Sequence, residues 1–180
     1  MTRPADETTY HDADNLYGDD LKSHNCDVPA SPPSRKSIPE MMSSLKLAAR
    51  IERWPIAGGF TISRGAKTEA VVIVAEVSSR ELKGSGIAGR GECVPYARYG
   101  ETPEGTLGEI LALEDAFHRG LDRQGLQERM KPGAARNAID CALWDLEAKI
   151  ANKRIWELLG QNAPRPLTTA YTISLGTPES

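Results

Sequence analysis

The sequence predicts an α+β fold, in which a three-stranded antiparallel meander is followed by a bundle of helices. Three β-rich runs lie between residues 45 and 94, and the short polar turns that join them favour an antiparallel meander. Helical spacing of apolar residues begins after residue 102 and continues to about residue 160. A further strand-like run, at residues 167–175, follows the helices.

Each of the three early runs has the pattern of a strand. Leu45–Pro55 alternates apolar and polar residues with a mostly two-residue period, which predicts a half-buried strand that ends at Pro55. Glu69–Val77 (EAVVIVAEV) is dense in β-branched residues and is the strongest strand signal in the chain. A shorter strand is expected at about Ile87–Val94.

A glycine-rich segment joins the second and third runs. Gly84, Gly86 and Gly89 have the G-x-G-x-x-G spacing of a dinucleotide-binding turn, but that site requires a helix after the glycines. Here a strand follows. The spacing therefore predicts a hairpin turn rather than a dinucleotide site.

The second half of the chain has helical patterning. Thr102 and Pro103 have the pattern of a helix N-cap followed by proline at the first helical position, and LGEILALEDAFHRGL continues with helical spacing. In residues 133–152 the apolar side chains form one continuous stripe of a helix, alanine-rich in its first half, so that another element can approach closely. The stripe consists of Ala135, Ala138, Ile139, Ala142, Leu143, Leu146 and Ile150. A short helix is expected at Lys153–Gly160, ended by its glycine.

Residues 1–43 predict a disordered acidic tail. Residues 1–40 hold four basic and eight acidic side chains and few β-branched or aromatic residues, so they bury too little apolar surface to offset the entropy of ordering. Regular patterning begins only after Met41 and Met42. Met1 and these two methionines are alternative natural start sites.

Composition argues against several classes of protein. Residues 41–180 hold eighteen basic and seventeen acidic side chains, and this lack of a basic excess disfavours nucleic acid binding. No apolar run approaches the length of a membrane span and no signal peptide is evident, so no membrane association is expected. Cys26, Cys93 and Cys141 are an odd, widely spaced set, which favours a reducing, cytoplasmic location over a disulfide or zinc framework.

Two loops carry the side chains expected to bind a ligand. Arg64 lies in a loop between two predicted strands, where a guanidinium could hold a carboxylate. Tyr96, Arg98 and Tyr99 form a second aromatic and cationic loop within GRGECVPYARYGET. Each loop taken alone is compatible with simple solvent exposure, and the pair is more suggestive of a site. The histidines and serines have no spacing typical of metal ligands or of a hydrolase nucleophile.

Four blocks of the sequence, in order, resemble the N-terminal part of dipeptide epimerases in the enolase superfamily. The blocks are GGFTISRGAKTEA, GRGECVPYARYGET, GAARNAIDCALWDLEAK with KRIWELLG, and PLTTAYTISLGTPE. The subgroup resembled is that of L-Ala-D/L-Glu epimerase-like and N-acetyl-D-glutamate racemase-like proteins. The resemblance implies an enolase-like N-terminal capping domain at residues 44–163 and the first strand of an incomplete (β/α) barrel at residues 164–180.

The resemblance also implies a chemistry and a set of site residues. Enzymes of this kind abstract a proton α to a carboxylate or carbonyl of a dipeptide or N-acyl amino acid, using two lysines and a Mg²⁺ held by three acidic residues on barrel strands. The implied substrate-binding residues are Arg64 as a clamp for a distal carboxylate, Tyr96, Arg98 and Tyr99 in the second capping loop, and Thr172 on the first barrel strand. Gly91 and Glu92 match a G-x-G-E strand end with a structural role.

The catalytic part of the pattern is missing. No Lys-x-Lys pair occurs in the sequence, and Lys149 and Lys153 fall on or beside capping-domain helices. We therefore expect no catalytic residue and no metal ligand in this chain, a truncated polypeptide that is inactive alone, and poor solubility or a homo-oligomer because of an unpaired barrel strand. The alternatives are a stand-alone capping module that pairs with a separate barrel, and a fragment of a muconate cycloisomerase-like or o-succinylbenzoate synthase-like enzyme.

Overall fold

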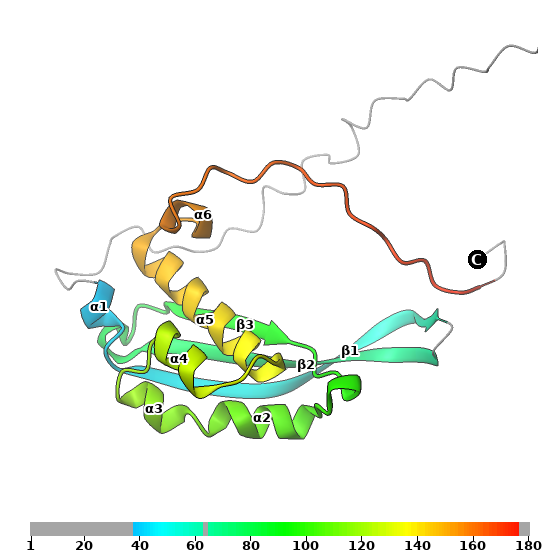
Figure 1. Cartoon of the computed structure of the whole chain (residues 1–180), viewed down its shortest axis with the longest axis horizontal. Coiled ribbons are helices and arrows are strands. Elements are labelled where there is room, and N and C mark those ends of the chain that lie inside the picture. The colour runs from blue at the N-terminus through cyan, green and yellow to red at the C-terminus, as the bar shows by residue number, and fades with distance from the viewer. Residues whose placement is uncertain (1–37, 63–64, 177–180) are drawn as a thin grey trace, which may run out of the picture. The chain divides into compact units, whose positions relative to one another are not determined.

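In the computed structural model, the described residues are 38–62 and 65–176, and all of them fall within one compact unit, Ser31–Ser180. An antiparallel sheet and a set of helices make up this unit (Figure 1). The strands are β1 (Leu45–Ile62), β2 (Gly65–Ser79) and β3 (Ala88–Cys93). The helices are α1 (Ile38–Met41), α2 (Pro103–Leu111), α3 (Glu114–His118), α4 (Arg123–Arg129), α5 (Ala134–Ala151) and α6 (Ile155–Leu158), with 3-10 turns η3 (Arg80–Leu82) and η4 (Ala97–Tyr99).

The sheet has the order β1-β2-β3 and is antiparallel throughout, which confirms the predicted meander. β1 is longer than predicted, because it continues past Pro55 to Ile62 with a break in register between Pro55 and Phe60. Pro55 is tolerated because β1 is an edge strand, where a missing backbone N–H disrupts no inner ladder. Because β3 pairs only with residues 73–78 of β2, the β1–β2 hairpin runs on beyond it as a two-stranded ribbon (Figure 1).

The turn between β2 and β3 has the predicted hairpin role. Gly84 and Gly86 have φ values of 88° and 74°, which favour glycine, and they follow η3 directly. Gly89 lies within β3 and makes a close approach to a helix instead. No helix begins at these glycines.

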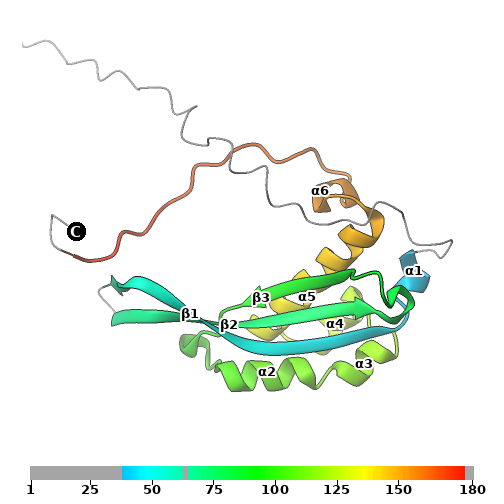
Figure 2. The same cartoon turned by 180° about the vertical axis from the view of Figure 1, so that it is seen from behind.

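The core lies between one face of the sheet and the helices. Seen from behind, the helices lie on a single side of the three strands (Figure 2). All seven residues of the apolar stripe predicted for residues 133–152 are buried on α5. They pack in one cluster with buried residues of the other elements, which include Leu45, Leu47, Ile73, Val77, Ile110 and Phe117.

β3 and α5 approach at backbone distance. A Cβ atom added to Gly89 would stand 2.0 Å from the carbonyl oxygen of Ala142, and one added to Gly91 would stand 1.9 Å from that of Ala138. Glycines on the strand therefore face alanines on the helix. This confirms the close approach that the alanine-rich stripe predicts and the structural role expected for Gly91.

The helix after the Tyr96–Tyr99 loop begins where predicted but ends earlier. Thr102 is the N-cap of α2, its hydroxyl accepts a hydrogen bond from the backbone N–H of Gly105 at 3.1 Å, and Pro103 is the first helical residue. The predicted continuous helix is divided, because the N–H of Leu113 bonds to the carbonyl of Ile110, three residues back instead of four. This tighter turn separates α2 from α3.

The first described residues differ from the disordered tail expected for residues 1–43. Residues 38–41 form α1, and Met41 is buried in the core. The hydroxyl of Ser79 at the end of β2 donates a hydrogen bond to the carbonyl of Met41. This buried packing and hydrogen bond fix the chain directly ahead of β1. Residues 1–37 of the expected tail lie outside the described residues.

The strand expected at Leu167–Leu175 is not formed. α6 ends before Gly160, whose φ is 64°, and residues 161–176 have no regular secondary structure. Tyr171 is 89 % exposed, and one backbone hydrogen bond, from Leu175 N to Thr61 O at 2.8 Å, joins this segment to β1. A strand needs a continuous ladder to a neighbour, and one such bond does not supply it.

Candidate functional site

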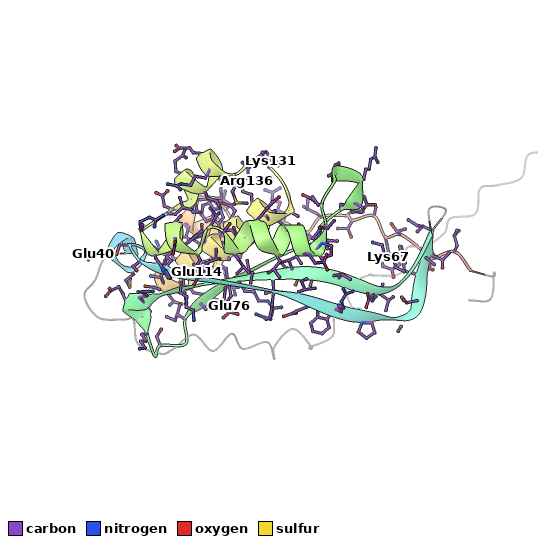
Figure 3. All side chains as sticks on the ribbon, turned by 90° about the horizontal axis from the view of Figure 1, so that it is seen from below. Glu40, Lys67, Glu76, Glu114, Lys131 and Arg136 are labelled. Atoms are coloured by element: carbon purple, nitrogen blue, oxygen red, sulfur yellow. The ribbon has the colours of Figure 1, made fainter. Side chains whose placement is uncertain are left out.

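The end of the β1–β2 hairpin and the loop after β3 lie at the same end of the sheet. β3 runs antiparallel to β2, so Cys93 at its C-terminal end pairs with Ile73, toward the hairpin end of β2. The amino group of Lys67, near the start of β2, stands over the ring of Tyr96 at 6.0 Å from the ring centre. Figure 3 shows Lys67 at the hairpin end of the ribbon. The start of β2 and the Tyr96–Tyr99 loop therefore adjoin one another.

The Tyr96–Tyr99 loop is a compact turn with exposed rings. Its 3-10 turn η4 is closed by hydrogen bonds from Tyr99 N to Tyr96 O at 2.8 Å and from Gly100 N to Ala97 O at 3.0 Å. Gly100 has a φ of 74°, which favours glycine at this position. The rings of Tyr96 and Tyr99 lie 5.9 Å apart at an interplanar angle of 44°, and Tyr99 is 76 % exposed. The pair presents an aromatic surface next to Lys67.

Of the other predicted substrate-binding residues, the structure describes Arg98 and Thr172 but not Arg64. Arg98 lies in η4, is exposed, and forms no hydrogen bond or ion pair with the described residues. Arg64 lies outside the described residues. Thr172 is exposed in the segment after α6, two residues before Ser174, whose hydroxyl accepts a hydrogen bond from the N–H of Thr61 at 3.0 Å. Tyr96 and Tyr99 are thus the predicted pair whose contact is described.

Glu101 is a site residue that the sequence reasoning did not assign. One oxygen of its carboxylate accepts a hydrogen bond from the N–H of Tyr96 at 2.9 Å, and the other accepts one from the N–H of Ala134 at 2.8 Å. The bonds from Ala134 and Tyr96, with a smaller effect of the positive charge of Lys131, lower the pKa of this carboxyl below its ordinary value of 4.5. The available sequence signal was its place between a tyrosine loop and a helix N-cap.

Side chains of α5 bond to the outer edge of β3. Asp145 accepts hydrogen bonds from the backbone N–H of Arg90 at 2.8 Å and from the amino group of Lys149 at 2.7 Å. Lys149 also donates to the carbonyl of Ala88 at 2.8 Å. Lys149 therefore holds the strand to the helix.

A second connection fixes α4 to α5. The guanidinium of Arg123 on α4 forms two hydrogen bonds of 3.0 Å with the carboxylate of Glu147 and lies 3.5 Å from the ring centre of Trp144. Such paired and stacked contacts use the planar geometry of arginine. α5 is thus tied to β3 on one side and to α4 on another.

The part of the chain that the structure describes has neither a cluster of metal-ligating side chains nor a helix able to cross a membrane. Within residues 38–62 and 65–176, no group of three or more His, Cys, Asp or Glu side chains is placed to hold a metal ion. Among the helices of these ranges, none has both the length and the apolar character needed to cross a membrane.

The three-stranded antiparallel sheet and its helices are the fold of the N-terminal capping domain of the enolase superfamily. Residues 44–160 match the N-terminal domain of the mandelate racemase / muconate lactonizing enzyme family, and the chain belongs to this family. This match confirms the predicted fold class and the resemblance stated above.

Curated relatives act on dipeptides and on acylated amino acids, as their names state. The chain is 42 % identical over 128 residues to the L-Ala-D/L-Glu epimerase of Escherichia coli K12, which covers 71 % of this chain and 38 % of that protein. It is 35 % identical over 111 residues to the N-acetyl-D-glutamate racemase of a Pseudoalteromonas species, which covers 61 % of this chain and 33 % of that protein. The chain thus spans well under half the length of both relatives.

The solved structures similar to this chain include a dipeptide epimerase and a protein with homology to dipeptide epimerases. A protein of Agrobacterium tumefaciens with homology to dipeptide epimerases, in complex with sodium and L-Ala-L-Glu, is 53 % identical with a TM-score of 0.65. That match covers 75 % of this chain and 40 % of the solved chain. A dipeptide epimerase of Enterococcus faecalis, in complex with Mg and L-Leu-L-Tyr, is 27 % identical with a TM-score of 0.54 and covers 64 % of this chain and 34 % of its own.

Proposed function

We propose that this chain is the capping part of a dipeptide epimerase or racemase of N-acylated amino acids, and that it supplies the substrate-specificity loops. The observation that carries this proposal is the contact of Lys67, at the end of the β1–β2 hairpin, with Tyr96 in the loop after β3. This contact brings a cation of β2 next to an aromatic ring of the following loop, a combination suited to recognition of a small acidic substrate. The names of the relatives support dipeptides and acylated amino acids as the substrate class.

The proposed roles follow the chemistry of each side chain. Arg64 pairs with a distal carboxylate of the substrate, because a planar guanidinium can bind both of its oxygens. Tyr96, Arg98 and Tyr99 line the second side of the binding surface, and Thr172 faces the substrate. These five residues bind and orient the substrate, and none of them exchanges a proton with it.

The proton transfer itself belongs to groups outside this set. The reaction we propose for the whole protein is abstraction of the proton α to a carboxylate or carbonyl, and the Enterococcus faecalis structure supports Mg²⁺ as the cofactor of the family. Among the described residues, no group of side chains is placed to hold Mg²⁺. We therefore expect the chain alone not to epimerise dipeptides.

A chimera tests the proposal. Residues 44–160 replace the matching N-terminal domain of the Escherichia coli epimerase, and conversion of L-Ala-L-Glu and racemisation of N-acetyl-glutamate are measured with Mg²⁺ present. We expect turnover of the dipeptide, and we expect Arg64→Ala to lower its kcat/KM by roughly ten- to a hundredfold through loss of a charged hydrogen-bonded pair. Activity on an uncharged dipeptide should change much less.

Lys83→Ala is the matched control for Arg64→Ala. Lys83 is an exposed cation in the β2–β3 turn, at the other end of the sheet, so its removal should leave both activities unchanged. A folded chimera without turnover of either substrate would contradict the proposed substrate class. Epimerisation by the 180-residue chain alone would contradict the assignment of catalysis to groups outside it.

A further inference from the structure

The carboxylate of Glu101 joins two parts of the fold that are 33 residues apart in sequence. Oε2 accepts the N–H of Tyr96 at 2.9 Å, and Oε1 accepts the N–H of Ala134 at 2.8 Å. Each oxygen therefore has its own backbone donor, one in the tyrosine loop and one at the start of α5. Both distances are those of charge-assisted hydrogen bonds.

At the loop, Glu101 closes a ring with Tyr96. The side chain of Glu101 accepts the N–H of Tyr96, and the backbone N–H of Glu101 donates to the carbonyl of Tyr96 at 3.4 Å. Residues 97–100 lie between these two connections and carry η4. Glu101, which follows the turn directly, therefore bonds twice to Tyr96, which precedes it, and so closes the turn.

At the helix, Glu101 satisfies a backbone group that the helix cannot satisfy itself. The first N–H groups of a helix have no partner within it, and the N-cap of α5, Gly133, has no side chain to accept one. The Glu101 carboxylate accepts the N–H of Ala134, the first residue of α5, and its negative charge suits the positive end of the helix. The space is filled closely, since a Cβ atom on Gly133 would stand 3.1 Å from Oε1.

α5 is held in place by β3, so a segment bonded to the first turn of α5 is held in place as well. Its backbone touches β3 at Gly89 and Gly91, and its side chains bond to the outer edge of that strand. A loop bonded to the start of α5 consequently takes its position from the sheet. The α5–β3 contact therefore sets the position of Tyr96 opposite Lys67.

We propose that Glu101 is a positioning residue, whose two hydrogen bonds fix the Tyr96–Tyr99 loop to α5 and so set where the two tyrosine rings meet the substrate. The assignment of the rings to substrate binding rests on the proposed function. The fixing of the loop by Glu101 does not depend on any substrate, so the two claims can fail separately.

Amide hydrogen exchange in the 180-residue chain tests the inference. Glu101→Gln preserves the length of the side chain but leaves one acceptor oxygen for two donors. We expect the N–H of Tyr96 or of Ala134, or both, to exchange roughly tenfold faster or more, because a hydrogen bond to a charged group is lost. Buried amides of the sheet, such as that of Ile73, should keep their rates.

Glu104→Gln is the matched control. Glu104 is exposed in the first turn of α2, three residues away, and its substitution makes the same change in charge. We expect it to leave the exchange of Tyr96 and Ala134 unchanged. Unaltered exchange of both amides in Glu101→Gln would overturn the inference, and so would an equal acceleration of Ile73, which would assign Glu101 to global stability.

Function is read separately, in the chimera described above. If Glu101 sets the position of the rings, Glu101→Gln should raise KM for L-Ala-L-Glu several-fold more than it lowers kcat, since it displaces binding groups and no reacting group. A fall in kcat at constant KM would overturn the positioning role. A chimera that turns over no substrate would refute the proposed function, and the exchange result would stand.

Discussion

Gly91 of β3 lies so close to Ala138 of α5 that a Cβ atom on the glycine would stand 1.9 Å from the alanine carbonyl oxygen. The obstacle is backbone, which cannot rotate away as a side chain can. We predict that Gly91→Ala lowers the free energy of unfolding by at least about 2 kcal/mol, because the helix must move off the strand. Urea denaturation of the 180-residue chain measures this.

Gly108→Ala is the control for that change. Gly108 is exposed in α2, and a Cβ atom there would meet nothing within 4 Å. Alanine should raise the stability by about 0.5–1 kcal/mol, since glycine is a poor residue for the interior of a helix. Equal effects at the two glycines would contradict backbone contact as the cause.

Removal of the Asp145 carboxylate should weaken the outer edge of β3. In Asp145→Ala, the N–H of Arg90 and the amino group of Lys149 both lose their acceptor, and we expect a loss of about 1–2 kcal/mol. An open strand edge also favours pairing between chains, so light scattering should show more association than in the parent. Asp115→Ala, at an exposed position of α3, should change neither quantity.

The two described cysteines should react at different rates with a thiol reagent. Burial, reinforced by the negative charge of Glu101, raises the pKa of Cys93 to about 11, whereas Cys141 is exposed and its pKa is raised by partial burial and by Asp140. Because the thiolate is the reactive form, iodoacetamide at pH 8 should modify Cys141 and spare Cys93 until the protein unfolds. Peptide mass spectrometry identifies the modified residue, and equal labelling of the two in the folded protein would refute the prediction.

Stability should depend on pH through Glu101. Its pKa is lowered in the folded protein, first by the hydrogen bonds from Ala134 and Tyr96, so its contribution is present above pH 4.5 and is lost as the pH falls through the folded value. The parent should therefore be more stable than Glu101→Gln at pH 7, with a difference that narrows below pH 4.5. Unfolding experiments across this range measure it. For Glu104→Gln, the difference in stability from the parent should not narrow in this way as the pH falls below 4.5.

Local sequence patterns predicted the elements whose formation depends on residues close together in the sequence. The three-and-four spacing from Ala135 to Ile150 identified every buried residue of α5, and Thr102 with Pro103 identified the start of α2. The end of β1 was missed because Pro55 is a strand breaker only where a neighbour needs its N–H, and whether a strand is at the edge depends on the whole sheet.

Contacts between distant residues account for the rest of what sequence did not predict. The loop of Tyr96 and Tyr99 was recognised from its composition, but the partner of Glu101 at Ala134 lies 33 residues further on and has no sequence pattern. The packing of Met41 and its bond to Ser79 likewise join parts of the chain 38 residues apart. The substrate-binding roles of Arg64, Tyr96, Arg98, Tyr99 and Thr172 all remain predictions.

The ribbon that β1 and β2 form beyond β3 differs in its mechanics from the three-stranded part of the sheet. A pair of strands without a third neighbour twists more strongly and resists bending less than a full sheet. The capping unit thus combines a stiff part, the Tyr96–Tyr99 loop bonded to α5 through Glu101, with a more flexible part, the β1–β2 ribbon. Under the proposed function, we expect the ribbon to bend to fit substrates of different bulk, while the loop of Tyr96 and Tyr99 keeps its place.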